Sequence, residues 1–273
     1  MVARRRLDAE LVRRKIARSR EHATELIRGR HVYVAGILAV KPATVVEPDV
    51  SIRVDDSVTD DWASRGAHKL LGALEAFEPL GLSLKGKKVL DAGASTGGFT
   101  DVCLRRDARE VVSVDVGYGQ LIWRLQNDDR VRVVDRTNIR HVTLEHTDGP
   151  CDAMVGDLSF ISLNLVLPAI VAVLEDGADL LPMVKPQFEV GKDRLGNGGV
   201  VKSPELRAEV TQEVALAAQQ LGLSLKGVVA SPLPGPSGNV EYFLWLVKDG
   251  GGAAKTAAEV AELVATAVQE GPQ

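Results

Sequence analysis

The stretch from Lys88 to Gly98, KVLDAGASTGG, constrains the fold of this chain more than any other feature. Its apolar run ends at Asp91 and passes into a glycine-rich turn, which predicts a buried strand, a tight turn and the start of a helix. Gly93, Gly97 and Gly98 carry no side chain and tolerate positive φ, so the backbone there can approach a ligand closely. We interpret the stretch as the floor of a nucleoside cofactor site, although a strand–helix junction without a ligand has the same pattern.

Apolar strands alternate with helical stretches from Lys87 onward. Such alternation predicts a parallel, doubly wound sheet, whose ligands bind beyond the carboxyl ends of the strands. We expect five such strands, over residues 89–93, 110–117, 131–135, 151–159 and 178–186, and then a hairpin-like pair over 225–230 and 240–247. Helices are expected over residues 99–106, 120–126, 163–174, 204–221 and 253–269. The fold class predicted for this part is therefore α/β, with a seven-stranded, mostly parallel sheet.

The turn after the first strand indicates which nucleoside cofactor binds. Asp115 ends the second strand, where a carboxylate accepts the ribose hydroxyls of such a cofactor. NAD-binding turns typically have the pattern G-x-G-x-x-G. This chain has G-A-S-T-G-G instead, with Ser95 in place of the second glycine. S-adenosylmethionine, which has no phosphates, fits this turn better than NAD does. The expected cofactor contacts are Asp91, Gly93, Ala94, Ser95, Thr96, Gly97, Asp115, Asn138 and Asp157.

The amino-terminal residues are basic, unlike the rest of the chain. Residues 1–31 hold ten Lys and Arg against four Asp and Glu, although the whole chain has a net charge of −4. A basic segment of this kind suggests an anionic partner, most often nucleic acid. Two short helices, the second capped by Ser19, and a small sheet are expected here. Aspartates from Asp55 to Asp61 indicate a boundary, so the expected parts are a small domain over 1–60, a linker over 61–68 and a larger domain over 69–273.

Cysteine content and hydropathy argue against a disulfide-rich, metal-binding, secreted or membrane-spanning protein. The two cysteines, Cys103 and Cys151, lie in no CxxC and are too few for a disulfide framework or a metal site, so we expect a reducing cytoplasm and no metal. The arginine-rich amino terminus has no apolar run of the kind found in signal peptides. The apolar segment from Leu163 to Leu174 contains Pro168 and is well short of the ~20 residues of a membrane span. We therefore expect no membrane association.

The basic segment resembles a known RNA-binding module. The sequence RLDAELVRRKIARSREHATELIRGRHVYVAGILAVKPATVV is similar to the αL RNA-binding domain of ribosomal protein S-four and of pseudouridine synthases. The resemblance implies a small α+β domain whose corner, Ala17 to Arg20, packs on structured RNA. Ala35 departs from the pattern, because the turn there more often has Asn. The expected RNA contacts are Arg4, Arg6, Arg14, Arg18 and Arg20, together with Arg65 after the boundary.

Seven further motifs are spread along the remaining chain between Ser64 and Trp245. They are SRGAHKL, DAGASTGGFTD, DVGYGQL, RTNIR, DLSFISL, MVKPQFEVGK and PLPGPSGNVEYFLW. Together they resemble the TlyA (haemolysin A) family of rRNA methyltransferases, with an FtsJ-like, Rossmann-like class I methyltransferase domain. The resemblance implies S-adenosylmethionine as cofactor, ribosomal RNA and ribosomal subunits as partners, and methylation of cytidine 2′-hydroxyls. It also implies a catalytic tetrad of Lys69, Asp157, Lys185 and Glu241.

Several alternatives stay open at this level. Lys185 is expected either to orient or to deprotonate the 2′-hydroxyl. A base N-methyltransferase usually has a Pro-Pro-aromatic turn after the fourth strand, whereas this chain has Leu158-Ser159-Phe160. A non-enzymatic RNA-binding protein in ribosome assembly and a pore-forming haemolysin are the other rivals. The linker departs from the family at Asp61-Trp62-Ala63, and the target nucleotide, the subunit and the oligomeric state are open.

Overall fold

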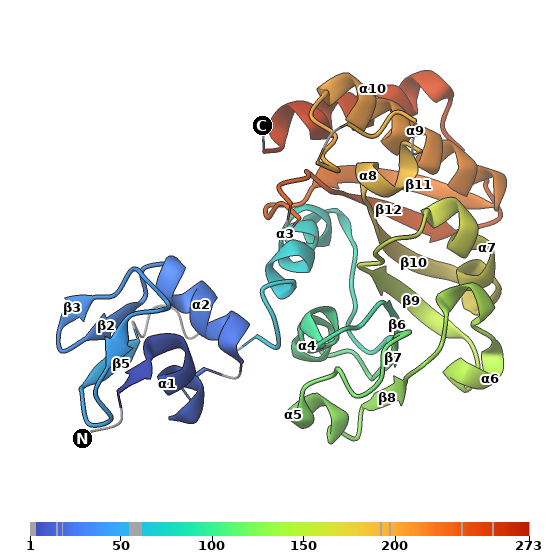
Figure 1. Cartoon of the computed structure of the whole chain (residues 1–273). Helices are drawn as coiled ribbons and strands as arrows, with labels where there is room; N and C mark the ends of the chain where they lie inside the picture. The colour runs from blue at the N-terminus through green and yellow to red at the C-terminus, as the bar shows by residue number, and fades with distance from the viewer. Residues whose placement is uncertain are drawn as a thin grey trace. The chain divides into compact units, whose positions relative to one another are not determined.

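The structure is a computed structural model, and it describes residues 4–14, 16–17, 19–54, 62–191, 193–196, 198–235, 237–252 and 254–272. The chain divides into two compact units, Met1–Asp61 and Trp62–Gln273 (Figure 1). Ala63 and Ala67, from the stretch expected to be a linker, are buried in the core of the second unit. The expected RNA contact Arg18 and the segment from Asp55 to Asp61 lie outside the described residues.

The first unit is a small α+β fold. Its helices are α1 (Leu7–Arg13) and α2 (Arg20–Arg28). Its strands are β1 (Arg5–Arg6), β2 (Val32–Val34), β3 (Ile37–Leu38), β4 (Val45–Val46) and β5 (Ile52–Val54), paired in the orders β3-β2-β5 and β1-β4. Ser19 caps α2, because its hydroxyl accepts the backbone N–H of His22 at 3.1 Å. Leu7, Leu11 and Ile27 are fully buried, so both helices contribute to one small core.

A seven-stranded sheet lies at the centre of the second unit (Figure 1). Its strands are β6 (Lys88–Ala92), β7 (Glu110–Val114), β8 (Val131–Val134), β9 (Cys151–Gly156), β10 (Leu174–Val184), β11 (Leu223–Ala230) and β12 (Tyr242–Lys248). The order is β11-β12-β10-β9-β6-β7-β8. β12 pairs antiparallel with β11 and β10, whereas the other neighbours are parallel. The predicted mostly parallel sheet with a hairpin-like end is therefore confirmed.

Helices cover both faces of this sheet. α3 (Ala67–Phe77) and α4 (Gly98–Arg105) pack on one face, and α7 (Leu163–Ala172), α9 (Pro204–Gln220) and α10 (Ala257–Glu270) pack on the other. The short helices are α5 (Trp123–Gln126), α6 (Leu144–Thr147) and α8 (Pro186–Glu189). α6 and α8 were not expected from the sequence, because a single turn is too short to show a helical period. α10 begins later than expected because Thr256 and Glu259 form a capping box.

The parallel strands end in register at one edge of the sheet. Ala92, the last residue of β6, lies opposite Val114 of β7 and Gly156 of β9. The residues that follow these three strands are Gly93, Asp115 and Asp157. Strand register therefore brings the polar residues that the sequence singled out to the same edge.

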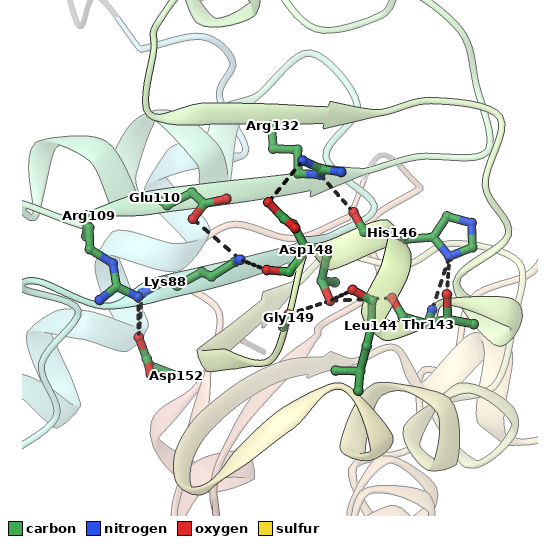
Figure 2. Close-up of polar contacts among 11 residues, drawn as sticks. Lys88, Arg109, Glu110, Arg132, Thr143, Leu144, His146, Asp148, Gly149 and Asp152 are labelled. Carbon is green, nitrogen blue, oxygen red and sulfur yellow. Dashed lines mark hydrogen bonds and ion pairs between the residues drawn. The ribbon is translucent and has the colours of Figure 1, made fainter.

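Charged side chains near the opposite edge pair with one another (Figure 2). The ammonium of Lys88, at the start of β6, donates to the Asp148 carbonyl at 2.8 Å and lies 3.5 Å from the Glu110 carboxylate. Arg132 donates to the His146 carbonyl at 3.0 Å. The Lys88 side chain is only 7% exposed, and a buried charge is tolerated when it is paired and hydrogen-bonded. We therefore assign this cluster to stability.

Replacement of Lys88 tests that assignment. Lys88→Met is expected to lower the free energy of unfolding of the second unit by about 1–3 kcal/mol, because the Asp148 carbonyl and the partly buried Glu110 carboxylate lose their charged partner. Urea unfolding followed by tryptophan fluorescence measures the change, since Trp62, Trp123 and Trp245 all belong to this unit. Lys85→Met, at an exposed position nearby, is the control, and an equal loss in both variants would contradict the assignment.

Candidate active site

Four charged side chains from distant parts of the chain form one continuous series at the carboxyl edge of the sheet. Lys69 lies in α3, Asp157 follows β9, Lys185 follows β10 and Glu241 precedes β12. The Lys69 ammonium donates to Glu241 Oε2 at 2.6 Å and lies 3.6 Å from Asp157 Oδ2. The Lys185 ammonium lies 2.5 Å from Asp157 Oδ1. The structure thus brings together all four members of the tetrad inferred from the sequence.

The tetrad is largely shielded from solvent. The side chains of Lys69, Lys185 and Glu241 are 6%, 7% and 1% exposed, and that of Asp157 is 24% exposed. Charges buried to this degree are stable only when opposite charges compensate them, and here positive and negative groups alternate. A side chain at Gly235 would place its Cβ 2.7 Å from Glu241 Oε1, so glycine at this position leaves room for the carboxylate.

Two pockets adjoin at this edge. The smaller one, of about 470 Å³, is lined by Gly93, Ser95, Asp115, Asn138 and Asp157 among others. The larger one, of about 910 Å³, is lined by Lys185 and Glu241 among others. Ser159, Phe160 and Ile161 line both pockets. The tetrad therefore has Asp157 at the smaller pocket and Lys185 at the larger.

The three glycines of the turn differ in backbone conformation and in the atoms that a side chain would meet. Gly93 has φ 86° and lines the smaller pocket, as the sequence interpretation expects. A Cβ at Gly97 would lie 2.3 Å from a Leu125 methyl carbon, and one at Gly98 would lie 2.3 Å from the Ser64 hydroxyl. These two glycines permit close packing inside the protein, and Gly97 also has φ 100°, in the left-handed region that favours glycine. Ala94, Thr96 and Gly97, expected as cofactor contacts, are not among the residues that line this pocket.

Asp115 organises the rim of the smaller pocket. Its Oδ2 accepts the Ser95 N–H at 2.8 Å and its Oδ1 accepts the Gly117 N–H at 2.7 Å. Each carboxylate oxygen has a further lone pair, so Asp115 can also accept hydrogen bonds from a ligand. Asn138 uses its side-chain oxygen to accept the Arg140 N–H at 3.1 Å, which leaves its amide N–H groups for other partners.

Asp91 lies beneath the pocket and does not line it. The residue is fully buried, and its Oδ2 accepts the Thr100 hydroxyl at 2.6 Å. That hydroxyl is also 2.8 Å from the Ser113 hydroxyl. Burial raises the pKa of Asp91 to about 7, and the hydrogen bond from Thr100 opposes this effect. The geometry gives Asp91 a place under the turn, which differs from the direct contact expected from the sequence.

The larger pocket is also lined by residues that the sequence motifs do not single out as functional. Phe160 is 90% exposed, has φ 63°, and its ring centroid is 5.2 Å from that of Phe188. Gln187 also lines this pocket, and its side-chain oxygen is buried without a hydrogen-bond partner among the described residues. The motifs DLSFISL and MVKPQFEVGK contain these residues, but a motif does not reveal exposure. An aromatic residue three positions after a catalytic candidate, Phe160 after Asp157 and Phe188 after Lys185, is the signal that could have identified the two aromatics.

Two carboxylates hold the arginines of the first unit. Asp8 is 2.9 Å from the guanidinium groups of both Arg6 and Arg20, whose side chains are 53% and 60% exposed. Glu10 accepts from Arg13 at 2.6 Å and from Arg14 at 2.8 Å. Hydrogen bonding from Arg6 holds the pKa of Asp8 at about 2, and that from Arg13 does the same for Glu10. The carboxylates thus fix the directions of basic side chains that still reach solvent.

The other expected RNA contacts differ in whether their side chains are free to reach RNA. Arg14 donates to the backbone carbonyls of Pro48 and Val50 at 2.6 and 2.7 Å, so it braces the inside of the first unit. Arg4 is exposed and lies 3.4 Å from Glu47. Arg65 is exposed in the second unit. The sequence could not separate the bracing arginine from the exposed ones, because the partners of Arg14 are distant backbone atoms.

Acid is expected to destabilise the first unit through Asp8 and Glu10. Their pKa values of about 2 lie below the ordinary values, so their stabilising contribution is present above about pH 4.5 and is lost as the pH falls towards 2. Amide hydrogen exchange in the first unit measures this loss. Asp8→Asn is expected to destabilise the unit at pH 7 and to reduce its remaining acid sensitivity. An unchanged acid sensitivity in that variant would contradict the assignment.

The fold and the site together define a class. A mostly parallel seven-stranded sheet, with a pocket beyond its carboxyl edge and a carboxylate after the second parallel strand, is the architecture of the Rossmann-like methyltransferases. None of the described helices has the length and apolar character to cross a membrane. In the part of the chain that the structure describes, no group of three or more His, Cys, Asp and Glu could hold a metal ion.

Comparisons with known proteins narrow the class to a family. The FtsJ-like methyltransferase model matches residues 62–248, and the S4 domain model matches residues 5–52. A relative from Mycobacterium tuberculosis, named 16S/23S rRNA (cytidine-2′-O)-methyltransferase TlyA, is 54% identical over 100% of both chains. Hemolysin A of Brachyspira hyodysenteriae is 32% identical over 87% of this chain and 97% of its own. The chain belongs to the TlyA family of FtsJ-like methyltransferases.

A solved structure extends the likeness to both units. A hemolysin-named protein from Streptococcus thermophilus is 35% identical to this chain. It matches with a TM-score of 0.76 and covers 99% of this chain and 98% of its own. The similarity therefore includes the S4-type unit as well as the methyltransferase unit.

Proposed function

We propose that this protein transfers a methyl group from S-adenosylmethionine to the ribose 2′-hydroxyl of cytidine in ribosomal RNA. The observation that carries the proposal is the series Glu241–Lys69–Asp157–Lys185, which ends where two pockets adjoin. The related protein from Mycobacterium tuberculosis is named for this reaction. A ribosomal substrate implies ribosomal subunits as partners and the cytoplasm as the place of action.

The smaller pocket is the proposed site for S-adenosylmethionine. Asp115 and Asn138 are the polar side chains that would hold its nucleoside part, and Gly93 brings backbone to the surface of the pocket. A Cβ at Gly93 would lie 3.0 Å from the Asp157 carbonyl oxygen and would narrow the space between the two strands. When bound, the cofactor supplies an electrophilic methyl group attached to sulfur.

The larger pocket is the proposed site for the target nucleotide. The 2′-oxygen must lose its proton during methyl transfer, and Lys185 is the group proposed to accept that proton or to orient the hydroxyl. Asp157 holds Lys185, while Glu241 holds Lys69 beside Asp157. Correct alignment of the reacting atoms can supply up to about 7–11 kcal/mol of the barrier reduction, which makes a rigid, buried tetrad useful here.

The first unit is the proposed anchor for ribosomal RNA. Arg4, Arg6 and Arg20 are exposed and basic, and contacts of this kind with phosphates provide affinity more than sequence information. Arg65 is proposed to add a contact from the second unit. Arg18 retains this role as a prediction from the sequence, whereas Arg14 is proposed to act indirectly, by bracing the unit.

Transfer of a labelled methyl group into ribosomal RNA tests the proposal. A 2′-O-methyl group protects the adjacent phosphodiester bond from alkaline cleavage, so the label is expected in alkali-resistant dinucleotides. Label in single nucleotides would instead favour base methylation. Calorimetry with S-adenosylmethionine provides the second readout, and no binding with or without RNA would favour a non-enzymatic RNA-binding protein. Leakage of pure lipid vesicles would be the result that favours a haemolysin.

A further inference from the structure

Lys185 has a second partner that is not part of the tetrad. Its ammonium donates to Ser159 Oγ at 2.8 Å, in addition to the ion pair with Asp157 at 2.5 Å. Ser159 lies two residues after Asp157 in the turn that follows β9, and it lines both pockets. The serine is exposed, whereas the Lys185 side chain is 7% exposed. The hydroxyl therefore lies at the junction of the pockets and contacts the amine directly.

Two partners constrain an amine more than one partner does. The Lys185 nitrogen has three tetrahedral directions besides its bond to carbon, and the Ser159 hydroxyl accepts a hydrogen bond along one of them. Asp157 Oδ1 lies 2.5 Å from the nitrogen as an ion-pair partner, but it accepts no hydrogen bond among the described residues. In the neutral amine, a hydrogen directed at the Ser159 hydroxyl keeps the lone pair out of that direction. Without the serine hydroxyl, the neutral amine could also direct its lone pair towards position 159.

We infer that Ser159 is a positioning residue that fixes the direction in which Lys185 meets the substrate hydroxyl. The inference rests on the proposed function, since it concerns the same 2′-oxygen. Where Lys185 accepts the proton, the oxygen–hydrogen bond breaks, the proton passes to the lone pair on Lys185 Nζ, and the oxygen forms its bond to the methyl carbon as the carbon–sulfur bond breaks; where Lys185 only orients the hydroxyl, the same hydrogen-bond direction sets the position of the oxygen. Ser159 neither gains nor loses a proton in this step.

Hydrogen bonds that do not involve the Ser159 hydroxyl hold the turn that carries Ser159. Glu189 accepts the Ser162 hydroxyl at 2.6 Å and the Leu163 N–H at 2.8 Å, which ties the end of the turn to α8. Burial raises the pKa of Glu189, and these hydrogen bonds oppose that effect. Because Ser159 itself is exposed, loss of its hydroxyl should leave the turn and the core in place. Its effect on rate can therefore be separated from an effect on folding.

Three variants of the full-length protein test the inference. Ser159→Ala is expected to lower kcat for rRNA methylation by about 10- to 100-fold, with the KM for RNA and the Kd for S-adenosylmethionine within about twofold of wild type. Ser159→Thr keeps the hydroxyl and is expected to recover most of kcat. Ser83→Ala removes an exposed serine hydroxyl outside the site and serves as the control for folding and handling.

The outcomes separate this inference from the proposed function. An inactive wild-type protein would overturn the proposed reaction, and the role of Ser159 with it. An active wild type together with a fully active Ser159→Ala variant would overturn the role of Ser159 alone. Equal losses of kcat in the alanine and threonine variants would also overturn it, because the hydroxyl would then not be the group that matters. A loss confined to KM would assign Ser159 to substrate binding and contradict its positioning of Lys185.

Discussion

Lys185→Ala is expected to lower the rate of methyl transfer by about 10²–10⁴-fold while the Kd for S-adenosylmethionine stays within about twofold of wild type. The reason is geometric, since Lys185 lines the larger pocket and is absent from the lining of the smaller one. Single-turnover methylation of ribosomal RNA measures the first quantity and calorimetry measures the second. Retained activity would remove Lys185 from the mechanism.

Lys185→Arg is the matched variant that separates the two roles open to this residue. Arginine keeps the positive charge and the donors but is effectively always protonated, so it can orient a hydroxyl and cannot accept its proton. Substantial activity in the arginine variant, with loss in the alanine variant, would assign Lys185 to orientation. Loss in both would favour proton acceptance.

Lys69→Met is expected to produce the largest loss of stability among these variants, about 3–5 kcal/mol. Removal of the ammonium leaves Glu241, 1% exposed, without its partner at 2.6 Å, and Asp157 loses its second positive neighbour. Urea unfolding of the second unit, followed by tryptophan fluorescence, measures the change. A loss below that of the Lys88→Met variant would contradict a central position for Lys69 in the buried charge series.

The double variant Lys69→Met, Glu241→Met distinguishes stability from catalysis. Replacement of both members of a buried ion pair by apolar side chains of similar size is often neutral, so most of the lost stability should return. Methylation should not return, because Asp157 would still lack the charge that helps to hold it. Full recovery of both quantities would assign the Lys69–Glu241 pair to structure alone.

The sheet and the edge that carries the site follow from the sequence because both depend on repeated local patterns. Alternating apolar strands and helices predict parallel pairing, and parallel pairing places Gly93, Asp115 and Asp157 together. The tetrad was inferred by resemblance. Spacing along the chain could not give it, because Lys69 and Glu241 are 172 residues apart.

Features that depend on distant atoms could not be predicted. Gly97 and Gly98 pack closely against Leu125 and Ser64, which no local pattern connects with the turn. Arg14 resembles its exposed neighbours in sequence, yet its donors are used inside the first unit by Pro48 and Val50. The contact between the Ser159 hydroxyl and Lys185 joins two separate loops, so no local pattern indicates it.

Mass mapping of ribosomal RNA, before and after treatment with the purified protein and S-adenosylmethionine, tests the central claim most directly. The expected result is a new 2′-O-methylcytidine, formed by the wild-type protein and absent or greatly reduced with Lys185→Ala. A methyl group found only on a base, or a ribose methyl group formed equally well by both proteins, would contradict a tetrad that acts on the 2′-hydroxyl.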